Sequence, residues 1–80
     1  MIQKTAAIVV PDLGDGIVSV QVALWLKKEG ERVAAEEDVV EVVTDKASFY
    51  VPSPSAGILK RIVVAAGEEA PIGAVLGELE

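Results

Sequence analysis

The fold is decided by the stretch Ile17-Val18-Ser19-Val20-Gln21-Val22-Ala23-Leu24-Trp25-Leu26-Lys27. Aliphatic side chains recur at every second position from Val18 to Leu26, the period of a β-strand with one buried face. An amphipathic helix would need apolar residues three and four positions apart, and the density of Val also disfavours a helix. The pattern predicts one long, half-buried strand, with Trp25 packing on the face opposite Val22 and Leu24.

The rest of the chain repeats this pattern in shorter pieces. Further strands are predicted at Ala6–Val10, Val39–Val43, Ser48–Val51, Ile58–Val64 and Ala74–Leu79, separated by turns rich in Gly, Pro, Asp and Lys. Two segments, Ala34–Asp38 and Ala65–Ala70, leave room for a helical turn, but both are too short for a stable helix. Closely spaced short strands predict an all-β sandwich or flattened barrel.

Composition bounds the function. The 80 residues allow one domain, 1–80, with a strand-rich core from about residue 5. The chain has no Cys and no His, which removes disulfides, Ser-His and Cys-His dyads and the usual zinc ligands. The net charge of −6 has the wrong sign for a nucleic acid or an anionic membrane surface. A long apolar run with a cleavage site is also lacking, so we expect a cytoplasmic location.

An internal repeat is visible when the chain is shifted by about 37 positions. Gly30 then aligns with Gly67, Glu31 with Glu68, Val39 with Leu76, Glu41 with Glu78, and Val42 with Leu79. We interpret this as two similar halves packed about a pseudo-twofold axis. The turn Thr44–Ala47 would match residues near Val9 in one half and positions just past residue 80 in the other. It would therefore lie at the end of the domain opposite both termini.

Chemistry is expected at the turn Thr44-Asp45-Lys46-Ala47, which joins two β runs. A lysine at a hairpin tip is most often a solvated charge. Its use as a nucleophile needs a depressed pKa, and the neighbouring Asp45 favours the charged form instead. If Lys46 has a function, it is as an attachment point.

At this residue the chain resembles the lipoyl domains of 2-oxo acid dehydrogenase complexes. The resemblance runs from Val10 to Leu79. Its motifs are Pro11-Asp12-Leu13-Gly14-Asp15-Gly16, Trp25-Leu26-Lys27-Lys28-Glu29-Gly30-Glu31-Arg32-Val33, Glu41-Val42-Val43-Thr44-Asp45-Lys46-Ala47 and Val51-Pro52-Ser53-Pro54-Ser55-Ala56-Gly57, followed by Gly67 and Gly73. Each motif is weak alone, but the ordered set is specific.

The resemblance implies a flattened barrel of two four-stranded antiparallel sheets with pseudo-twofold symmetry. It implies that Lys46 carries covalently bound lipoic acid, presented by Thr44, Asp45 and Ala47. The domain would be a swinging-arm acyl carrier in a dihydrolipoyl acyltransferase component, and not an enzyme by itself. Its partners would be a lipoate ligase, a thiamine-dependent 2-oxo acid dehydrogenase, the acyltransferase core and dihydrolipoyl dehydrogenase. The resemblance also makes the chain the N-terminal part of a longer subunit, monomeric when isolated, in bacterial cytoplasm or the mitochondrial matrix.

The sequence departs from the family pattern at several positions. Asp15 stands where the family usually has Glu, Val20 where it often has Gly, and Tyr50 where it commonly has an acid. We expect Asp15, Glu41 and Tyr50 to contribute to partner recognition. Acidic residues around the domain would attract a basic partner surface; they are Glu29, Glu31, Glu36, Glu37, Asp38, Glu41 and Asp45.

Three alternatives remain open. A biotinyl carrier domain resembles the same fold, but its motif has Met on both sides of the lysine, whereas the flanks here are Asp45 and Ala47. The second alternative is an all-β interaction module that is never modified. The third is an enzyme using paired carboxylates, although no pair has a distinguishing context.

Overall fold

The computed structural model describes residues 6–14 and 16–80 of the chain. Within this part, eight strands are found. They are β1 (Ala6–Val9), β2 (Ser19–Trp25), β3 (Arg32–Val33), β4 (Asp38–Val43), β5 (Ser48–Pro52), β6 (Gly57–Ile62), β7 (Glu69–Pro71) and β8 (Val75–Leu79). No segment of this part is helical, so none could cross a membrane as a helix.

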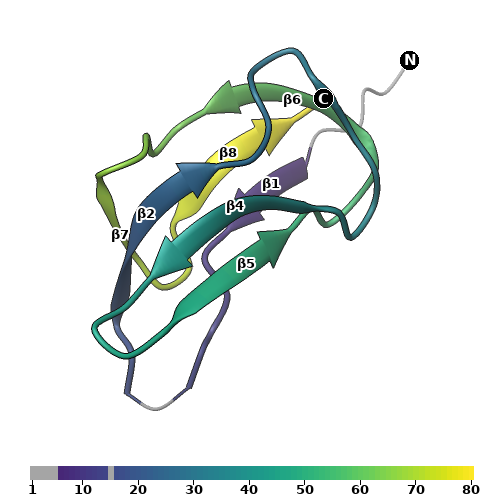
Figure 1. Ribbon diagram of the computed structural model, residues 1–80. Helices are drawn as coiled ribbons and strands as arrows, with labels where there is room; N and C mark the ends of the chain where they lie inside the picture. The colour runs from purple at the N-terminus through teal and green to yellow at the C-terminus, as the bar shows by residue number, and fades with distance from the viewer. Residues whose placement is uncertain (1–5, 15) are drawn as a thin grey trace.

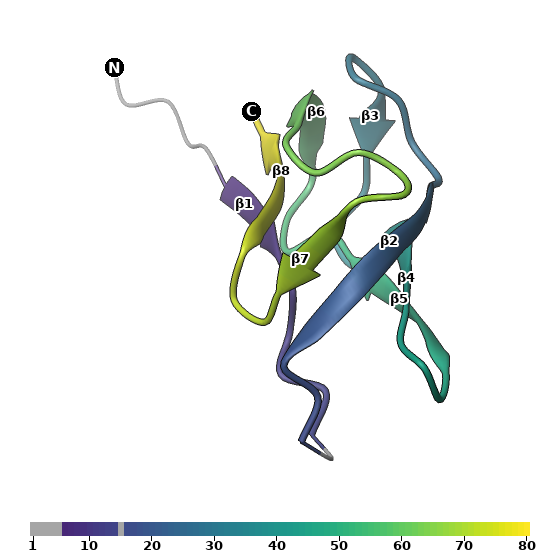
Figure 2. The ribbon, with the colours of Figure 1, turned by 90° about the vertical axis from the view of Figure 1, so that its left-hand side faces the viewer.

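The strands form two antiparallel four-stranded sheets, ordered β1-β8-β6-β3 and β5-β4-β2-β7. The sheets wrap around a common interior to make a flattened barrel (Figure 1; Figure 2). The core consists almost entirely of aliphatic side chains, which are Ile8, Val10, Val20, Val22, Val33, Val39, Val40, Val42, Val51, Leu59, Ala70, Leu76 and Leu79. The predicted all-β class and the two-sheet architecture are confirmed.

The predicted long strand is shorter and is interrupted by a β-bulge. Val22 pairs with Val42, but Leu24 pairs with Glu41, so Ala23 is an extra residue on β2. The bulge reverses the alternation of inward and outward side chains, so that Trp25 faces inward as Val22 does. The face predicted for Trp25 was therefore wrong. Trp25 packs against the core on the same side as Val22 and donates its Nε1–H to the Val64 carbonyl at 2.8 Å, whereas Leu24 is 51% exposed.

The two segments with room for a helical turn are turns of another kind. Ala34–Glu37 closes through the Glu37 N–H, which donates to the Ala34 carbonyl at 3.2 Å, and Ala65–Glu68 closes in the same way at 3.0 Å. In each turn the glutamate carboxylate also accepts the first N–H, at 2.9 Å. Short strands, β3 and β7, lie beside these turns; their two and three residues are too few to show a period.

The predicted pseudo-twofold relation is present in the hydrogen bonds. The Gly30 N–H donates to the Leu59 carbonyl at 2.7 Å, and 37 positions on, the Gly67 N–H donates to the Val22 carbonyl at 2.7 Å. The bulge of β2 also recurs in β6, where Lys60 is the extra residue between Leu59 and Arg61. The relation exchanges the two sheets strand for strand, with β2 matching β6 and β4 matching β8.

One part of the predicted correspondence needs correction. β5 matches β1 with an offset of 43 residues, since Tyr50 pairs with Glu41 as Ala7 pairs with Glu78. Val9 is therefore the counterpart of Pro52, and not of the lysine turn. The β4–β5 turn still lies at the end of the barrel opposite Ala6 and Glu80, as expected (Figure 1; Figure 2).

Candidate functional site

Thr44 organises the turn that carries Lys46. Its N–H donates to the Ala47 carbonyl at 2.8 Å. Its hydroxyl oxygen accepts the N–H groups of Lys46 and Ala47 at 3.2 and 3.1 Å, and its hydroxyl hydrogen can be donated to the Ala47 carbonyl at 3.2 Å. A Ser/Thr turn of this kind satisfies the backbone locally and fixes the direction in which the next side chain leaves.

Asp45, Lys46 and Ala47 are all exposed, while Thr44 is half-buried. The paired residues Val43 and Ser48 close the hairpin directly below the turn. The structure thus brings the four predicted turn residues together, with Lys46 at the tip of a braced hairpin. In the described part of the chain, neither Lys46 nor Asp45 forms an ion pair.

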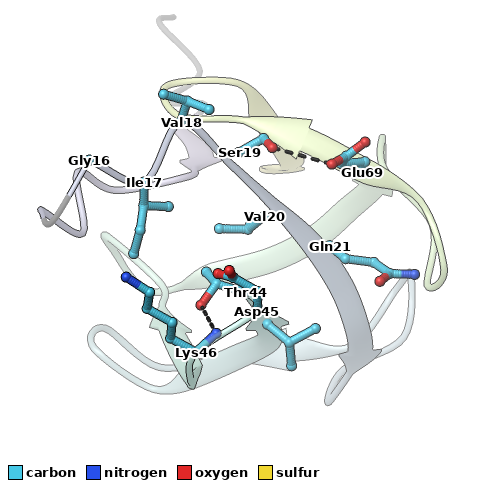
Figure 3. Close-up of a pocket in the computed structure, with 11 residues that line it drawn as sticks. Gly16, Ile17, Val18, Ser19, Val20, Gln21, Thr44, Asp45, Lys46 and Glu69 are labelled. Carbon is cyan, nitrogen blue, oxygen red and sulfur yellow. Dashed lines mark hydrogen bonds between the residues drawn. The ribbon is translucent and has the colours of Figure 1, made fainter.

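A shallow groove lies beside the turn. One wall is Thr44, Asp45 and Lys46, and the other is the chain from Gly16 through Ile17 into β2. Figure 3 shows the Lys46 amine directed toward Ile17 across this groove. No function was predicted for Ile17 and Val18 from the sequence, although Val18, at 76% exposure, is the most exposed large aliphatic side chain in the described residues.

The three residues expected to contact partners fall into two groups. Glu41 and Tyr50 are direct cross-strand neighbours on β4 and β5, so the structure places them together. Asp15 lies outside the described residues.

Several of the acidic residues expected to attract a partner have structural roles and lie in the connections from β2 to β4, at the end of the sheet opposite the lysine turn. Glu29 accepts the Ile62 N–H at 2.8 Å, and Glu31 accepts the Lys28 N–H at 2.7 Å. Glu37 accepts the Ala34 N–H and pairs with Lys27 Nζ at 2.9 Å. The Ala34 N–H, followed by Lys27, lowers the pKa of Glu37, and the same contact with Glu37 raises the pKa of Lys27. These carboxylates stabilise turns, so their number alone is no measure of a partner surface.

Nothing in the described residues resembles a metal centre, because no three His, Cys, Asp or Glu side chains are grouped there. The arrangement offers one chemical feature, a primary amine on a hydrogen-bonded turn. An exposed amine with a clear approach can form an amide with a carboxylic acid, which is the bond that a lipoyl or biotinyl group would need.

Comparison with known proteins places this geometry in a family. The profile of the family described as biotin-requiring enzyme, which covers biotin and lipoyl domains, matches residues 6–79. The chain is 43% identical over 76 residues to the dihydrolipoyllysine-residue succinyltransferase component of the 2-oxoglutarate dehydrogenase complex of Bartonella vinsonii subsp. berkhoffii, covering 95% of this chain and 18% of that protein. It is 40% identical over 75 residues to the lipoamide acyltransferase component of the branched-chain alpha-keto acid dehydrogenase complex of Pseudomonas aeruginosa, covering 94% and 17%.

The solved lipoyl domain from the dihydrolipoyl succinyltransferase component of the Escherichia coli 2-oxoglutarate dehydrogenase complex is 37% identical. It superposes with a TM-score of 0.78 over 96% of both chains. The chain thus spans less than a fifth of its curated relatives but nearly all of a solved lipoyl domain. It belongs to the biotin/lipoyl attachment-domain family, and within that family to the lipoyl domains.

Proposed function

We propose that the ε-amino group of Lys46 carries lipoic acid in amide linkage and that the domain is a swinging-arm acyl carrier. The observation that supports this most directly is the exposed Lys46 on the turn braced by Thr44, at the far end of the barrel from Ala6 and Glu80. The family membership supports the same modification. Biotin is the second candidate, and the flanks Asp45 and Ala47 disfavour it.

The residues of the turn would fit the group in three ways. Lys46 supplies the amine, its exposure leaves the approach open, and Thr44 fixes the root of the arm. The lysine and lipoyl chain together reach about 13 Å when extended. When bound, the dithiolane would supply a strained S–S bond able to accept an acyl group together with two electrons from the acyl donor.

The protein itself would bind, orient and deliver, and would catalyse no step when isolated. A rigid root converts each meeting with a partner active site into an encounter at high effective concentration. The proposed partners are a lipoate ligase, a thiamine-dependent 2-oxo acid dehydrogenase, the acyltransferase core and dihydrolipoyl dehydrogenase. The same reasoning proposes an acyltransferase component as the parent protein, in bacterial cytoplasm or the mitochondrial matrix.

The decisive experiment is the intact mass of the domain after incubation with ATP, lipoic acid and a lipoate ligase. Biotin and a biotin ligase form the parallel reaction. We expect one lipoyl increment, mapped by peptide analysis to Lys46, and none from biotin. A biotinyl increment would favour the second candidate, and a folded domain modified by neither ligase would overturn both.

A further inference from the structure

The groove beside the lysine turn has a counterpart at the opposite end of the barrel. Gln21 and Glu69 pair in the first groove as Ile58 and Arg32 pair in the second. Three further pairs of lining positions are also 37 residues apart, namely Ser19 and Ala56, Val20 and Gly57, and Val43 and Glu80. The second groove is therefore an internal reference for the first.

The first groove differs from its counterpart in having an aliphatic wall. Ile17 and Val18, in the chain entering β2, line the first groove, and Val18 is largely exposed. The equivalent positions in the other half are Pro54 and Ser55, which do not line the second groove. The fold thus accepts a hydroxyl where Val18 stands and does not require an aliphatic residue there. Adjacent aliphatic side chains along a groove favour an apolar occupant.

The charge within the first groove changes when Lys46 is modified. Of the described residues that line it, Lys46 alone is a cation, and Asp45 and Glu69 are acids. A free ammonium group is strongly hydrated and has little affinity for aliphatic side chains. Amide formation removes this charge and extends the side chain with apolar methylenes and the dithiolane. The proposed arm is therefore chemically suited to the aliphatic wall, whereas the free amine is not.

The arm would be long enough to lie across the groove. Figure 3 shows the Lys46 amine directed toward Ile17. The far side of the groove is Glu69 on β7, two strands from β4, which is about 10 Å at the usual strand spacing. The extended arm spans about 13 Å. Because its attachment keeps the arm at a high effective concentration, weak apolar contacts are sufficient to hold it.

The two sides of the groove offer different contacts. At the far side the Ser19 hydroxyl donates to Glu69 at 3.2 Å, so this side is polar (Figure 3). The aliphatic contacts are concentrated at Ile17 and Val18, next to the root of the arm. An apolar arm bending back from Lys46 would meet these two side chains first.

We propose that Ile17 and Val18 form a resting site for the lipoyl arm of the same domain. When no partner is engaged, the methylenes and the dithiolane lie against these two side chains. The groove is shallow, so the contact is reversible and the arm leaves when a partner active site binds the dithiolane. A resting arm has an S–S bond that is less accessible to thiols in solution. This inference rests on the proposed function and adds a contact within the domain to it.

The contact is tested directly by NMR on the lipoylated wild type. The domain is isotopically labelled and is modified with unlabelled lipoic acid, so that filtered NOE spectra select contacts between the arm and the protein. We expect NOEs from the arm to the methyl groups of Ile17 and Val18. We also expect shifts of these methyl signals relative to the unmodified domain. Shifts confined to the turn 44–47, without such NOEs, would overturn the resting site.

A matched pair of variants tests the consequence for the S–S bond. Val18→Ser copies the residue at the equivalent position, Ser55, and Val63→Ser changes an exposed valine that does not line the groove. Dithiothreitol reduces the dithiolane to a dithiol while its own two thiols are oxidised to a disulfide. We expect this reduction to be at least twofold faster for Val18→Ser than for the wild type, and unchanged for Val63→Ser. Neither substitution alters the charge near the bond.

Equal reduction rates for the wild type and Val18→Ser, or equal acceleration by the two substitutions, would contradict the resting site. Either result would leave the carrier function intact, because all three proteins would still carry the lipoyl group. A wild-type domain that no lipoate ligase modifies would overturn the carrier function, and the resting site with it. If Val18→Ser did not fold, the NOE measurement on the wild type would still decide.

Discussion

The indole of Trp25 occupies the space that a side chain at Gly77 would need. A Cβ placed on Gly77 would lie 2.9 Å from Cη2 of Trp25 and 3.0 Å from the Arg61 carbonyl oxygen. In the other half of the domain the same two positions hold Ile62 and Val40. One half of the domain therefore combines a large residue, Trp25, with a glycine at these two positions, whereas the other half has two aliphatic residues of medium size.

Gly77→Val is expected to destabilise the domain by about 1–3 kcal/mol, because the added atoms have no room. Adding Trp25→Ile copies the pair of the other half and should recover part of the loss, although the hydrogen bond to Val64 is lost. Chemical denaturation of the single and double variants measures both effects. If the double variant were no more stable than Gly77→Val, the steric conflict would lie with the Arg61 backbone and not with Trp25.

Thr44→Val removes the acceptor for two turn N–H groups while keeping the shape of the side chain. We expect hydrogen exchange at Lys46 and Ala47 to accelerate roughly fivefold, the effect of losing about 1 kcal/mol locally. Lipoylation should slow, with little change in Tm, because the turn is exposed. Thr44→Ser keeps the hydroxyl and serves as the control; a loss equal to that of Thr44→Val would show that the hydroxyl is not what braces the turn.

Moving the lysine by one position tests whether its place on the hairpin matters. Lys46→Ala should fold with an unchanged Tm and accept no lipoyl group. The double variant Asp45→Lys with Lys46→Asp keeps the net charge and the exposure but changes the direction of the amine, so we expect no modification by mass spectrometry. Efficient lipoylation at position 45 would mean that exposure alone is sufficient.

Glu37 gives stability a dependence on pH. Its pKa is lowered in the folded domain by the Ala34 N–H and by Lys27. A group with a lowered folded pKa contributes stability that is complete above its unfolded pKa of about 4.3 and is lost as the pH falls through the folded value. Glu37→Gln should therefore cause a small decrease in Tm at pH 7 that disappears near pH 3.

Glu36→Gln is the matched control, since it removes the same charge from the neighbouring exposed position. A decrease in Tm with the same pH profile would point to general charge effects and not to the contacts of Glu37.

Much of the fold follows from period-two patterning, but the bulge does not. Nothing in the residues around Ala23 distinguishes a bulge from a continuing strand, because Leu24 and Trp25 are both plausible core residues. Only the pairing with β4 determines which one faces inward. Strands β3 and β7 were also not predictable from pattern, since their hydrogen bonds depend on the partners β6 and β2.

The candidate site also has features that the sequence predicts and features that only the strand pairing determines. The prediction that Lys46 is modified depends on the family resemblance, because a lysine in a turn is by itself indistinguishable from an ordinary solvated charge. That Glu41 lies between Tyr50 and Leu24 is a matter of register, and the bulge shifts the register on one side. The internal repeat at 37 positions was visible in the sequence. That Leu24 and Arg61 pair with equivalent glutamates, Glu41 and Glu78, appears only in the strand pairing of the structure.

Because the pseudo-twofold relation exchanges the sheets, the β4–β5 turn and the region of Ala6 and Glu80 are equivalent ends of the barrel. A rearranged gene that opened the chain in one connecting loop and joined Glu80 to Ala6 through a second Thr-Asp-Lys-Ala turn would give a domain with a lysine hairpin at each end. Such a protein would carry two arms pointing in opposite directions. It would test whether a single barrel can serve two partner active sites at once.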